Sequence, residues 1–242
     1  MPLRHSPEPM GRQTGDLQSM GDVQIEKIDQ SKLRESAYSS LRDAFLRGEF
    51  APGDVVSLRN LADMLGTSMT PVREAVRRLV AEGALMDTPS RTLVVPPFDP
   101  RRMSDLKAGR LALEGLVLEQ AMDRLQPADV DALEAMLAGA TRKPGAGADL
   151  DLNYRFHFRI YALSGSEVLI PLIEALWLQY GAYLNVIVAQ KRAREIDEHK
   201  LHRALIAAFR AGDREAARAA LTADIERSFG IVAARLQANG AQ

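Results

Sequence analysis

Three prolines within five residues, Pro96, Pro97 and Pro100, constrain this chain more than any other feature. Proline fixes the backbone φ angle and has no N–H to donate, so neither a helix nor a central strand can run through this segment. Short helical patterns separated by glycines precede it, and helix-period patterns follow it almost without a break. We therefore expect two folded units in the 242 residues, joined by a linker over residues 97–100.

Composition narrows the fold and the chemistry of both units. Aromatic residues make up only 5% of the chain, which argues against the core of a β-sandwich or barrel. The chain has no cysteine, which excludes disulfides, thiolate-bound metals and a cysteine nucleophile. No apolar run approaches the roughly 20 residues of a membrane span, and the N-terminus lacks the apolar region of a secretory signal. We expect a mostly α-helical, cytoplasmic protein.

The N-terminal part of the sequence predicts an arm, three helices and a hairpin. Residues 1–30 are polar and lack periodicity, so we expect a disordered arm. From Ser31, apolar residues recur at helical spacing, and two further helical segments and two short strands follow. Caps and glycines mark the element boundaries at Gly48, Ser57, Gly66, Thr70 and Gly83. This order over residues 31–96 predicts a winged helix-turn-helix.

The third of these helices carries polar side chains opposite its apolar stripe. Thr70, Arg73 and Arg77 share this polar side. In a helix-turn-helix the first residues of the second helix meet base edges, so Arg73 can bind guanine with two hydrogen bonds. Arg77 or Arg78 can neutralise a phosphate. The pattern alone fits equally well a solvated face with pairs such as Glu74–Arg78.

The stretch LRDAFLRGEFAPGDVVSLRNLADMLGTSMTPVREAVRRLVAEGAL resembles the DNA-binding domain of the GntR family. The PGD turn, the LA-x-x-LG-x-S turn and TPVREA followed by RL and EG occur in the order of that family. The resemblance implies DNA contacts from the short helix, the turn, the recognition helix and the wing. The matching residues are Arg59, Ser68, Met69 (where the family usually has arginine), Thr70, Arg73 and Arg91, and Arg77 joins them by its place on the helix.

Beyond Pro100 the sequence predicts an all-α bundle. Helical patterns cover about residues 104–125, 128–140, 149–163, 167–188, 194–211 and 213–237. The segments DLKAGRLALEGLVLEQA, LNYRFHFRIYALSGS and HRALIAAFRAGDREAARAAL resemble the FCD-type effector domain of the FadR subfamily, over residues 101–238. The resemblance implies a ligand-binding and dimerisation domain, and hence a homodimer that reads a palindromic DNA operator.

Four polar residues of this region are candidate metal ligands. Asn153 and His157 lie four residues apart on one helix face, and His202 and Asp224 lie ten residues before and twelve after Gly212. If Gly212 turns a helix hairpin, a 1.5 Å rise places both roughly 15–18 Å from the turn, at one level. Two oxygens and two imidazoles form a workable cage for zinc, nickel or manganese. Metal-binding members of the FCD type carry Asp or Asn, His, His and His here, so Asp224 replaces the last histidine.

Alternatives stay open for these four residues. They also fit a buried, hydrogen-bonded set without metal, and Asp224 fits a site that no longer binds one. His199, one turn before His202, is an alternative ligand, although the resemblance to the FCD type, aligned at the AGD turn, implies His202.

Arg110, in the first helix after the linker, is the candidate effector contact. The resemblance implies an arginine that points into the pocket, and a guanidinium binds a carboxylate through two parallel hydrogen bonds. An ordinary ion pair with Glu114, four residues later, fits the spacing equally well. Trp177, Tyr180 and Tyr183 are interpreted as core or pocket wall.

Together these features predict a transcriptional regulator whose operator affinity responds to a small carboxylate, with or without a metal. Repression relieved by the ligand is the expected logic, and activation stays open. A metal-free helical dimerisation regulator fits nearly as well. A metal-dependent helical enzyme is disfavoured because the sequence has no H-E-x-x-H, Glu-x-x-His, P-loop or GxGxxG motif.

Overall fold

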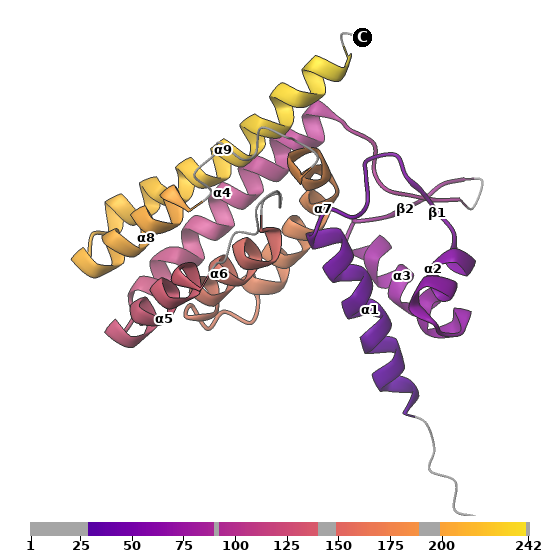
Figure 1. Ribbon diagram of the computed structural model, residues 1–242, viewed down its shortest axis with the longest axis horizontal. Coiled ribbons are helices and arrows are strands. Elements are labelled where there is room, and N and C mark those ends of the chain that lie inside the picture. Colours follow the sequence, from indigo (N-terminus) through magenta and orange to yellow (C-terminus); the bar gives the residue numbers. More distant parts are fainter. Residues whose placement is uncertain (1–28, 90–91, 140–148, 189–198, 241–242) are drawn as a thin grey trace, which may run out of the picture.

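The computed structural model of the chain describes residues 29–89, 92–139, 149–188 and 199–240 (Figure 1). Within these ranges the chain forms an N-terminal unit of three helices and three short strands, followed by a helical unit of six helices. The elements are α1 (Gln30–Leu46), β1 (Val55–Val56), α2 (Leu58–Leu65), α3 (Met69–Ala81), β2 (Met86–Asp87), β3 (Leu93–Val94), α4 (Pro100–Met122), α5 (Pro127–Ala138), α6 (Leu150–Ala162), α7 (Leu169–Val188), α8 (Lys200–Ala211) and α9 (Arg214–Gly240). The predicted fold class, a winged helix-turn-helix followed by an all-α bundle, is confirmed.

The first helix begins inside the predicted arm. Asp29 is the N-cap of α1, and its carboxylate accepts hydrogen bonds from the backbone N–H groups of Ser31 and Lys32. Such caps satisfy N–H groups that have no partner within the helix. Gln30 therefore belongs to the helix rather than to the arm, and the remaining arm residues, 1–28, lie outside the described ranges.

The third helix also begins earlier than the sequence predicts. Its N-cap is Ser68, so Thr70 lies within the first turn and the prediction of Thr70 as N-cap was wrong. Pro71 is tolerated at the third position because N–H groups in the first turn have no helical acceptor. Arg73 consequently sits two residues deeper in the helix than expected.

The small sheet has three strands in the order β1-β3-β2, all antiparallel. β2 and β3 form the predicted hairpin, and its tip, residues 90–91, lies outside the described ranges. β1 was not predicted, because it pairs with a strand far along the chain and not with a neighbour across a turn. Its register is set by a distant segment, with Val55 opposite Val94 and Val56 opposite Leu93.

The helical unit begins at Pro100, inside the predicted linker and four residues before the expected start of its first helix. Asp99 caps α4 by accepting a hydrogen bond from the N–H of Arg101 at 2.8 Å. Proline is favoured at the first helical position because its missing N–H would have no partner there. The last proline of the cluster is thus the first residue of α4, and the linker is shorter than the sequence predicts.

Gly212 turns α8 into α9, as the sequence predicts. Its φ of +66° lies in the left-handed region that glycine adopts without strain. The two helices run back along each other, and α9 also lies beside α4 (Figure 1). Residues on α8 and α9 at matched distances from Gly212 are therefore brought to one level of the bundle.

One helix of the bundle, α7, also contacts the N-terminal unit. A Cβ on Gly181 would overlap the backbone carbonyl of Phe45 in α1, so the close approach of these two helices requires glycine. Arg102 of α4 donates to the carbonyl of Gly83, just after α3, at 2.8 Å, and to Oε1 of Gln179 in α7 at 2.7 Å. The end of α3 is thereby joined to two helices of the bundle.

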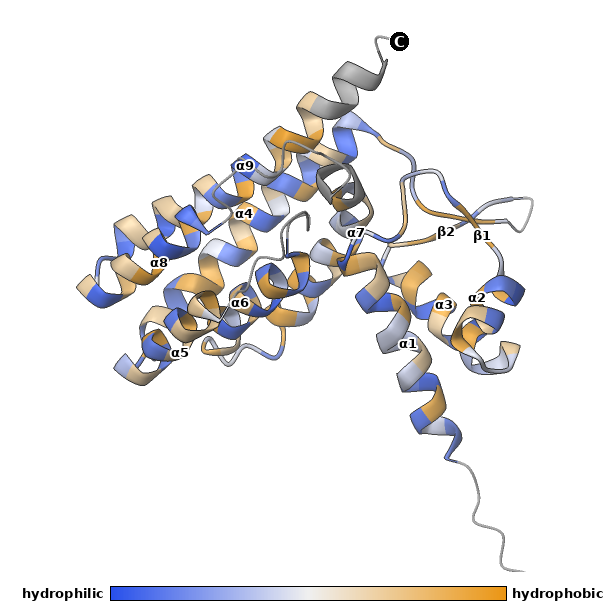
Figure 2. Cartoon of the chain, in the orientation of Figure 1, coloured by the Kyte–Doolittle hydropathy of each residue, from blue (hydrophilic) through white to orange (hydrophobic). Residues whose placement is uncertain are grey.

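Polar and apolar residues alternate around the helices (Figure 2), and the buried apolar side chains of both units form one connected core. Val72 and Leu79 fill this core in the N-terminal unit, and Ile173 and Leu205 fill it in the helical unit. Among the described residues, no helix is both long and apolar enough to cross a membrane.

Candidate DNA-binding face and buried metal centre

Six of the seven residues predicted to contact DNA are exposed, on α2, on α3 and at the N-cap of α3. Val72 and Val76, on the other side of α3, are buried. A groove of about 560 Å³ runs between α3 and the wing, with Arg73 and Arg77 on one side and Asp87 and Leu93 on the other. The exposed candidates are Arg59, Ser68, Met69, Thr70, Arg73 and Arg77, whereas Arg91 lies outside the described residues.

The three arginines of α3 have different partners. Arg77 forms an exposed ion pair with Glu74 at 2.8 Å, so the expected Glu74–Arg78 pair does not form. Arg78 instead contacts Glu35 and Glu82 and lies over the ring of a tyrosine in α1, which holds it away from the groove. Arg73 has no ion pair with a described residue. Arg73 and Arg77 are therefore the cations of α3 that face the groove.

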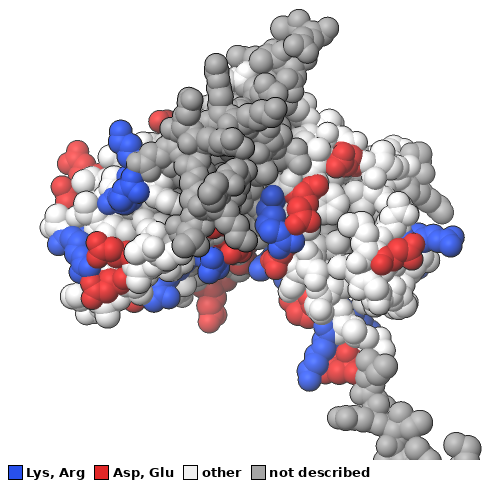
Figure 3. Space-filling model, in the orientation of Figure 1, with Lys and Arg blue, Asp and Glu red and all other residues white. Residues whose placement is uncertain are grey.

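Charge over the rest of the visible surface is mixed. Lys and Arg alternate with Asp and Glu on the face shown in Figure 3, in line with the formal net charge of −1. Attraction for an anionic polymer must therefore come from a local set of residues such as the α3 face rather than from the whole molecule.

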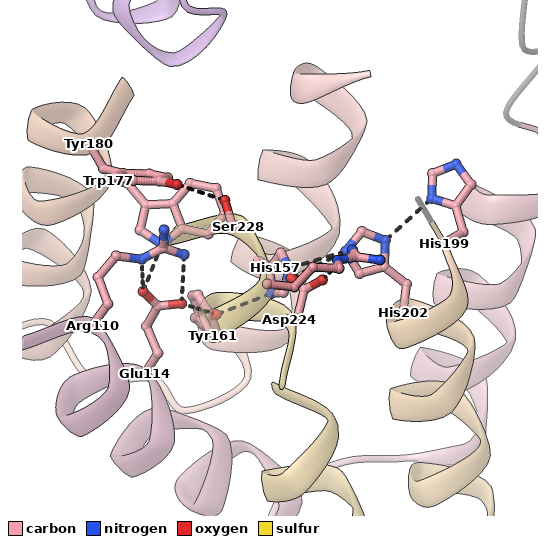
Figure 4. Close-up of polar contacts among 11 residues, drawn as sticks. Arg110, Glu114, His157, Tyr161, Trp177, Tyr180, His199, His202, Asp224 and Ser228 are labelled. Carbon is pink, nitrogen blue, oxygen red and sulfur yellow. Dashed lines mark hydrogen bonds and ion pairs between the residues drawn. The ribbon is translucent and has the colours of Figure 1, made fainter. Parts of the chain in front are cut away.

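The helical unit contains a buried cluster of His157 from α6, His202 from α8 and Asp224 from α9 (Figure 4). Their exposed fractions are 0%, 1% and 7%. Nε2 of His157 lies 3.1 Å from Oδ2 of Asp224 and 3.2 Å from Nε2 of His202. Nε2 of His202 lies 3.8 Å from Oδ2 of Asp224. Three of the four predicted ligands thus converge from three helices.

The two other candidates stand next to this cluster. Asn153 is half-buried one turn before His157 on α6, and within the described part of the chain its side chain makes no hydrogen bond to the cluster. His199, the alternative ligand, precedes α8 and places its Nδ1 3.4 Å from Nδ1 of His202, on the side away from Asp224 (Figure 4). Of the two histidines, His202 is the one that meets His157 and Asp224.

The protonation states within the cluster suit a cation. Burial favours the neutral form of Asp224, but the hydrogen bond with His157 and the charges of His157, His202 and Arg227 outweigh it, so its pKa is lowered. Burial, reinforced by His157, lowers the pKa of His202 to about 3. At neutral pH His202 is therefore neutral and Asp224 is ionised, and these are the forms that bind metals.

The geometry of the donor atoms also fits a metal. Nitrogen and oxygen ligands at about 2.0–2.2 Å from one ion lie about 3–3.5 Å from each other. Two of the three donor separations fall in this range, and the third, at 3.8 Å, is slightly wider. The two facing Nε2 atoms cannot both present lone pairs at 3.2 Å without a proton or a metal ion between them. Two imidazoles and one carboxylate are common ligands of zinc and of similar divalent ions.

Arg110 lies in the same buried region but is already paired. Its Nε donates to Oε1 of Glu114 at 2.5 Å and its Nη2 donates to Oε2 at 3.3 Å. The guanidinium lies 4.1 Å from the ring centre of Trp177 and is also flanked by Tyr180 and Phe229. The pairing with Glu114 that the spacing allowed is therefore present, within a wall of aromatic rings.

Glu114 and Tyr161 connect these groups, and neither was predicted to belong to the site. Glu114 is fully buried and accepts hydrogen bonds from Trp177 and Tyr161 as well as from Arg110. Tyr161, in turn, lies 3.2 Å from Nδ1 of His157. The available signal was the i,i+4 spacing of Arg110 with Glu114 and of His157 with Tyr161, which places each pair on one helix face.

Comparison with known proteins identifies both units. Residues 33–95 match the gntR family of bacterial regulatory proteins, and residues 105–227 match the FCD domain. The chain is 30% identical over 210 residues to the HTH-type transcriptional regulator McbR of Escherichia coli K12, a match covering 85% of this chain and 95% of McbR. The chain belongs to the GntR family.

A solved structure and a further relative agree with this assignment. The solved structure of E. coli McbR aligns with this GntR-family chain at a TM-score of 0.77 and 28% identity, covering 87% of this chain and 100% of that one. A protein of Paenarthrobacter nicotinovorans, named a probable D-xylose utilization operon transcriptional repressor, is 27% identical over 199 residues, 78% of this chain and 85% of that protein. These proteins are regulators and not enzymes. This GntR-family chain is a transcriptional regulator, as the sequence predicts.

Proposed function

We propose that this GntR-family regulator binds a palindromic operator as a homodimer and that one divalent metal in its helical unit helps a small carboxylate control the operator affinity. Residues 29–96 form the proposed DNA-binding unit, and residues 101–238 the proposed sensing and dimerisation unit. The observation that carries the proposal is the convergence of His157, His202 and Asp224 from three helices, with donor separations that suit one ion.

On the DNA side, the proposed contacts are Arg59, Ser68, Met69, Thr70, Arg73, Arg77 and Arg91. Arg73 is proposed to read a base because it faces the groove between α3 and the wing and has no ion pair with a described residue. Arg77 is proposed to contact phosphate, giving up its exposed pair with Glu74, which costs little in water. Met69 supplies an apolar contact where the family usually has arginine.

In the helical unit, Nε2 of His157, Nε2 of His202 and Oδ2 of Asp224 are the proposed ligands, with Asn153 one turn away as a fourth. Zinc, nickel and manganese all accept this nitrogen and oxygen set. A bound ion would supply an open coordination position for a carboxylate. The protein's own contribution is to hold the three side chains in place, because each comes from a different helix.

Repression relieved by the carboxylate is the proposed logic, supported by the similarity to the regulator from P. nicotinovorans that is named a probable repressor. Arg110 is proposed as a second contact for the effector. Because Glu114 already gives Arg110 a carboxylate partner, an effector carboxylate there would take the place of Glu114. The exchange would leave Glu114 buried without its counter-charge, so only a ligand that also gains the metal contact would drive it.

The helix α7 is the proposed connection between this site and the DNA-binding unit. Trp177 and Tyr180 on α7 contact the Arg110 guanidinium, whereas Gln179 and Gly181 on the same helix contact the N-terminal unit. A small displacement of α7 on effector binding would therefore change how the two DNA-binding units of a dimer are held. The DNA-binding units would then have one arrangement with the effector and another without it. A ligand that binds one of these arrangements more tightly shifts the operator affinity accordingly.

The competing function is a metal-free dimerisation regulator. Arg227 favours it, because this cation already binds Oδ1 of Asp224 at 2.8 Å and so neutralises the carboxylate without a metal. The two functions differ in what purified protein contains and in whether added metal stabilises it.

The metal is tested by elemental analysis of protein purified without chelator and by melting with added zinc, nickel or manganese. We expect one metal per chain and a stabilisation of about 2.7 kcal/mol at a hundredfold excess over Kd. His157→Ala should abolish the shift. The matched control is Tyr154→Phe on the same helix, whose hydroxyl donates to Glu174 and makes no hydrogen bond to the converging set, and it should preserve the shift. Protein without metal, and no shift that depends on His157, would favour the metal-free regulator.

The regulatory part is tested by selecting operators from a random DNA pool. We expect a palindromic consensus sequence that is bound by a dimer. Light scattering of the complex measures how many chains bind one operator. Small carboxylates added with the metal should then lower the affinity for this operator. A consensus without twofold symmetry, or one monomer per operator, would contradict the homodimer.

A further inference from the structure

The hydroxyl of Tyr161 lies between Glu114 and His157, in the centre of a buried polar chain (Figure 4). Its oxygen is 2.5 Å from Oε2 of Glu114 and 3.2 Å from Nδ1 of His157. Tyr161 and Glu114 are both fully buried, so bulk solvent does not compete for these hydrogen bonds. Tyr161 follows His157 by one helical turn, which places the two side chains on one face of α6.

The direction of each hydrogen bond follows from the number of protons. The hydroxyl of Tyr161 has one proton, and an ionised carboxylate can only accept. Glu114 is held in place by Arg110 and by the indole N–H of Trp177, which both donate to it. The short distance to Glu114 therefore assigns the phenol proton to that carboxylate. The phenol oxygen is left as an acceptor, and it faces Nδ1 of His157.

A neutral imidazole has a single N–H, and in His157 two acceptors compete for it: the phenol oxygen of Tyr161 at Nδ1 and the ionised carboxylate of Asp224 at Nε2. With Nδ1–H donating to Tyr161, Nε2 has a lone pair, and it is Nε2 that faces Asp224 and His202. With the other tautomer, an N–H would point at the position of the ion and His157 could not bind it. The second ligand imidazole has the same arrangement, since Nδ1 of His202 faces His199 and Nε2 faces the cluster.

We propose that Tyr161, oriented by Glu114, is a positioning residue that holds His157 in the Nδ1-protonated tautomer with Nε2 directed at the metal. This inference rests on the proposed metal site and adds two residues to it. It also gives the Arg110–Glu114 pair a role beyond packing, because the pair fixes the carboxylate that fixes the tyrosine. Outer partners of this kind typically change metal affinity by about 10–100-fold when they are removed.

The test is Tyr161→Phe, which removes one oxygen and keeps the ring in the core. The matched control is Tyr154→Phe on the same helix, whose hydroxyl also donates to a glutamate, Glu174, at 3.3 Å but does not contact a histidine. Zinc affinity is measured by competition with a chromogenic chelator. We expect Tyr161→Phe to weaken zinc binding by about 10–100-fold and Tyr154→Phe to leave it unchanged. Equal affinity of Tyr161→Phe and wild type would overturn the proposal.

A second measurement needs no metal and separates this inference from the proposed function. The ¹⁵N shifts of imidazole nitrogens distinguish the two tautomers, and the chain has only four histidines to assign. In metal-free protein at pH 8.5, where Tyr161 and Asp224 compete for the proton of His157, we expect a mixture of tautomers in the wild type and the Nε2-protonated form alone in Tyr161→Phe. Equal tautomer populations in the two proteins would refute the positioning role. If the populations differ but the wild type binds no zinc, the metal site fails while the hydrogen-bond assignment stands.

Discussion

The exposed face of α3 and the buried cluster of the helical unit place their polar side chains under different physical conditions. On α3 the proposed DNA contacts lie within ten residues of one another and are exposed, so their partners can come from outside the molecule. The cluster joins three helices, and its side chains are buried, so each must be satisfied from within. We infer that substitutions on the exposed face of α3 change DNA binding alone, whereas substitutions in the buried cluster change the stability of the protein as well.

The largest effect is expected where a buried charge loses its partner. Arg110→Met should destabilise the protein by about 3–5 kcal/mol, because Glu114 would remain buried without a counter-charge. Arg110→Met combined with Glu114→Gln should recover much of this loss, because no net charge is then buried. The measurement is urea unfolding of both variants.

An exposed pair provides the comparison. Arg210 binds Asp131 and Glu134 at the surface, and Arg210→Met should barely change the unfolding midpoint. If Arg110→Met were as stable as Arg210→Met, the distinction between the buried and the exposed region would be wrong.

On α3 the expected loss concerns DNA affinity. Arg73→Ala should weaken binding to the selected operator by about 1–3 kcal/mol and relax one base preference. Arg77→Ala should weaken binding to all sequences alike and reduce the salt dependence by about one ion. Both variants should unfold like the wild type, because both side chains are exposed. A loss of stability, or unchanged operator affinity in Arg73→Ala, would contradict the assignment of this face.

The contact between the two regions should be sensitive to a single methyl group. Gly181→Ala would push α7 away from the backbone of Phe45 and should cost about 1–3 kcal/mol, as overpacking does. Gly230→Ala in α9 is the control, since no atom lies within 4 Å of its Cβ position and alanine favours helices. Thermal unfolding measures both. Equal stability of the two variants would show that the units are not closely packed at Gly181.

Much of the fold could be predicted because its boundaries are marked locally. Gly66 and Gly212 end helices where the sequence indicates, and both adopt the left-handed conformation. The misplaced elements depend on contacts that local patterns do not report. The register of β1 comes from its distant partner β3, and the N-cap of α3 is Ser68 although Thr70 has the same capping chemistry.

The candidate site could be predicted only in part for the same reason. Counting residues around Gly212 correctly indicated that His202 and Asp224 lie at one level, and the structure brings both to His157. Sequence spacing could not show that α4 faces α6, so the link from Glu114 through Tyr161 to His157 was missed. That these residues hold a metal stays a prediction, because the same geometry also suits a hydrogen-bonded cluster.

The smallest expected effect concerns a buried polar contact within the DNA-binding unit itself. The hydroxyl of Tyr38 in α1 donates to the carboxylate of Glu82, just after α3, at 2.8 Å from either oxygen. Burial, with the hydrogen bond and charge of Glu82, raises the pKa of Tyr38 above its usual 10. A raised pKa means that the contact contributes fully below pH 10 and is lost as the pH rises above 10.

Tyr38→Phe should therefore cost about 1 kcal/mol at pH 8. The difference in free energy of unfolding between the variant and the wild type should shrink as the pH passes 10, since the variant has no hydroxyl to ionise at this position. Urea unfolding of both proteins at pH 8, 9, 10 and 10.5 measures it, and the remaining tyrosines ionise in both and cancel. Glu82 is only half-buried and keeps its ion pair with Arg78 when the hydroxyl of Tyr38 is removed, so the cost should stay below that of Arg110→Met. A difference in free energy of unfolding that grows with pH would mean that Tyr38 ionises more readily in the folded protein than in the unfolded chain. Burial would then not set the pKa of polar groups in this unit as it does in the helical unit.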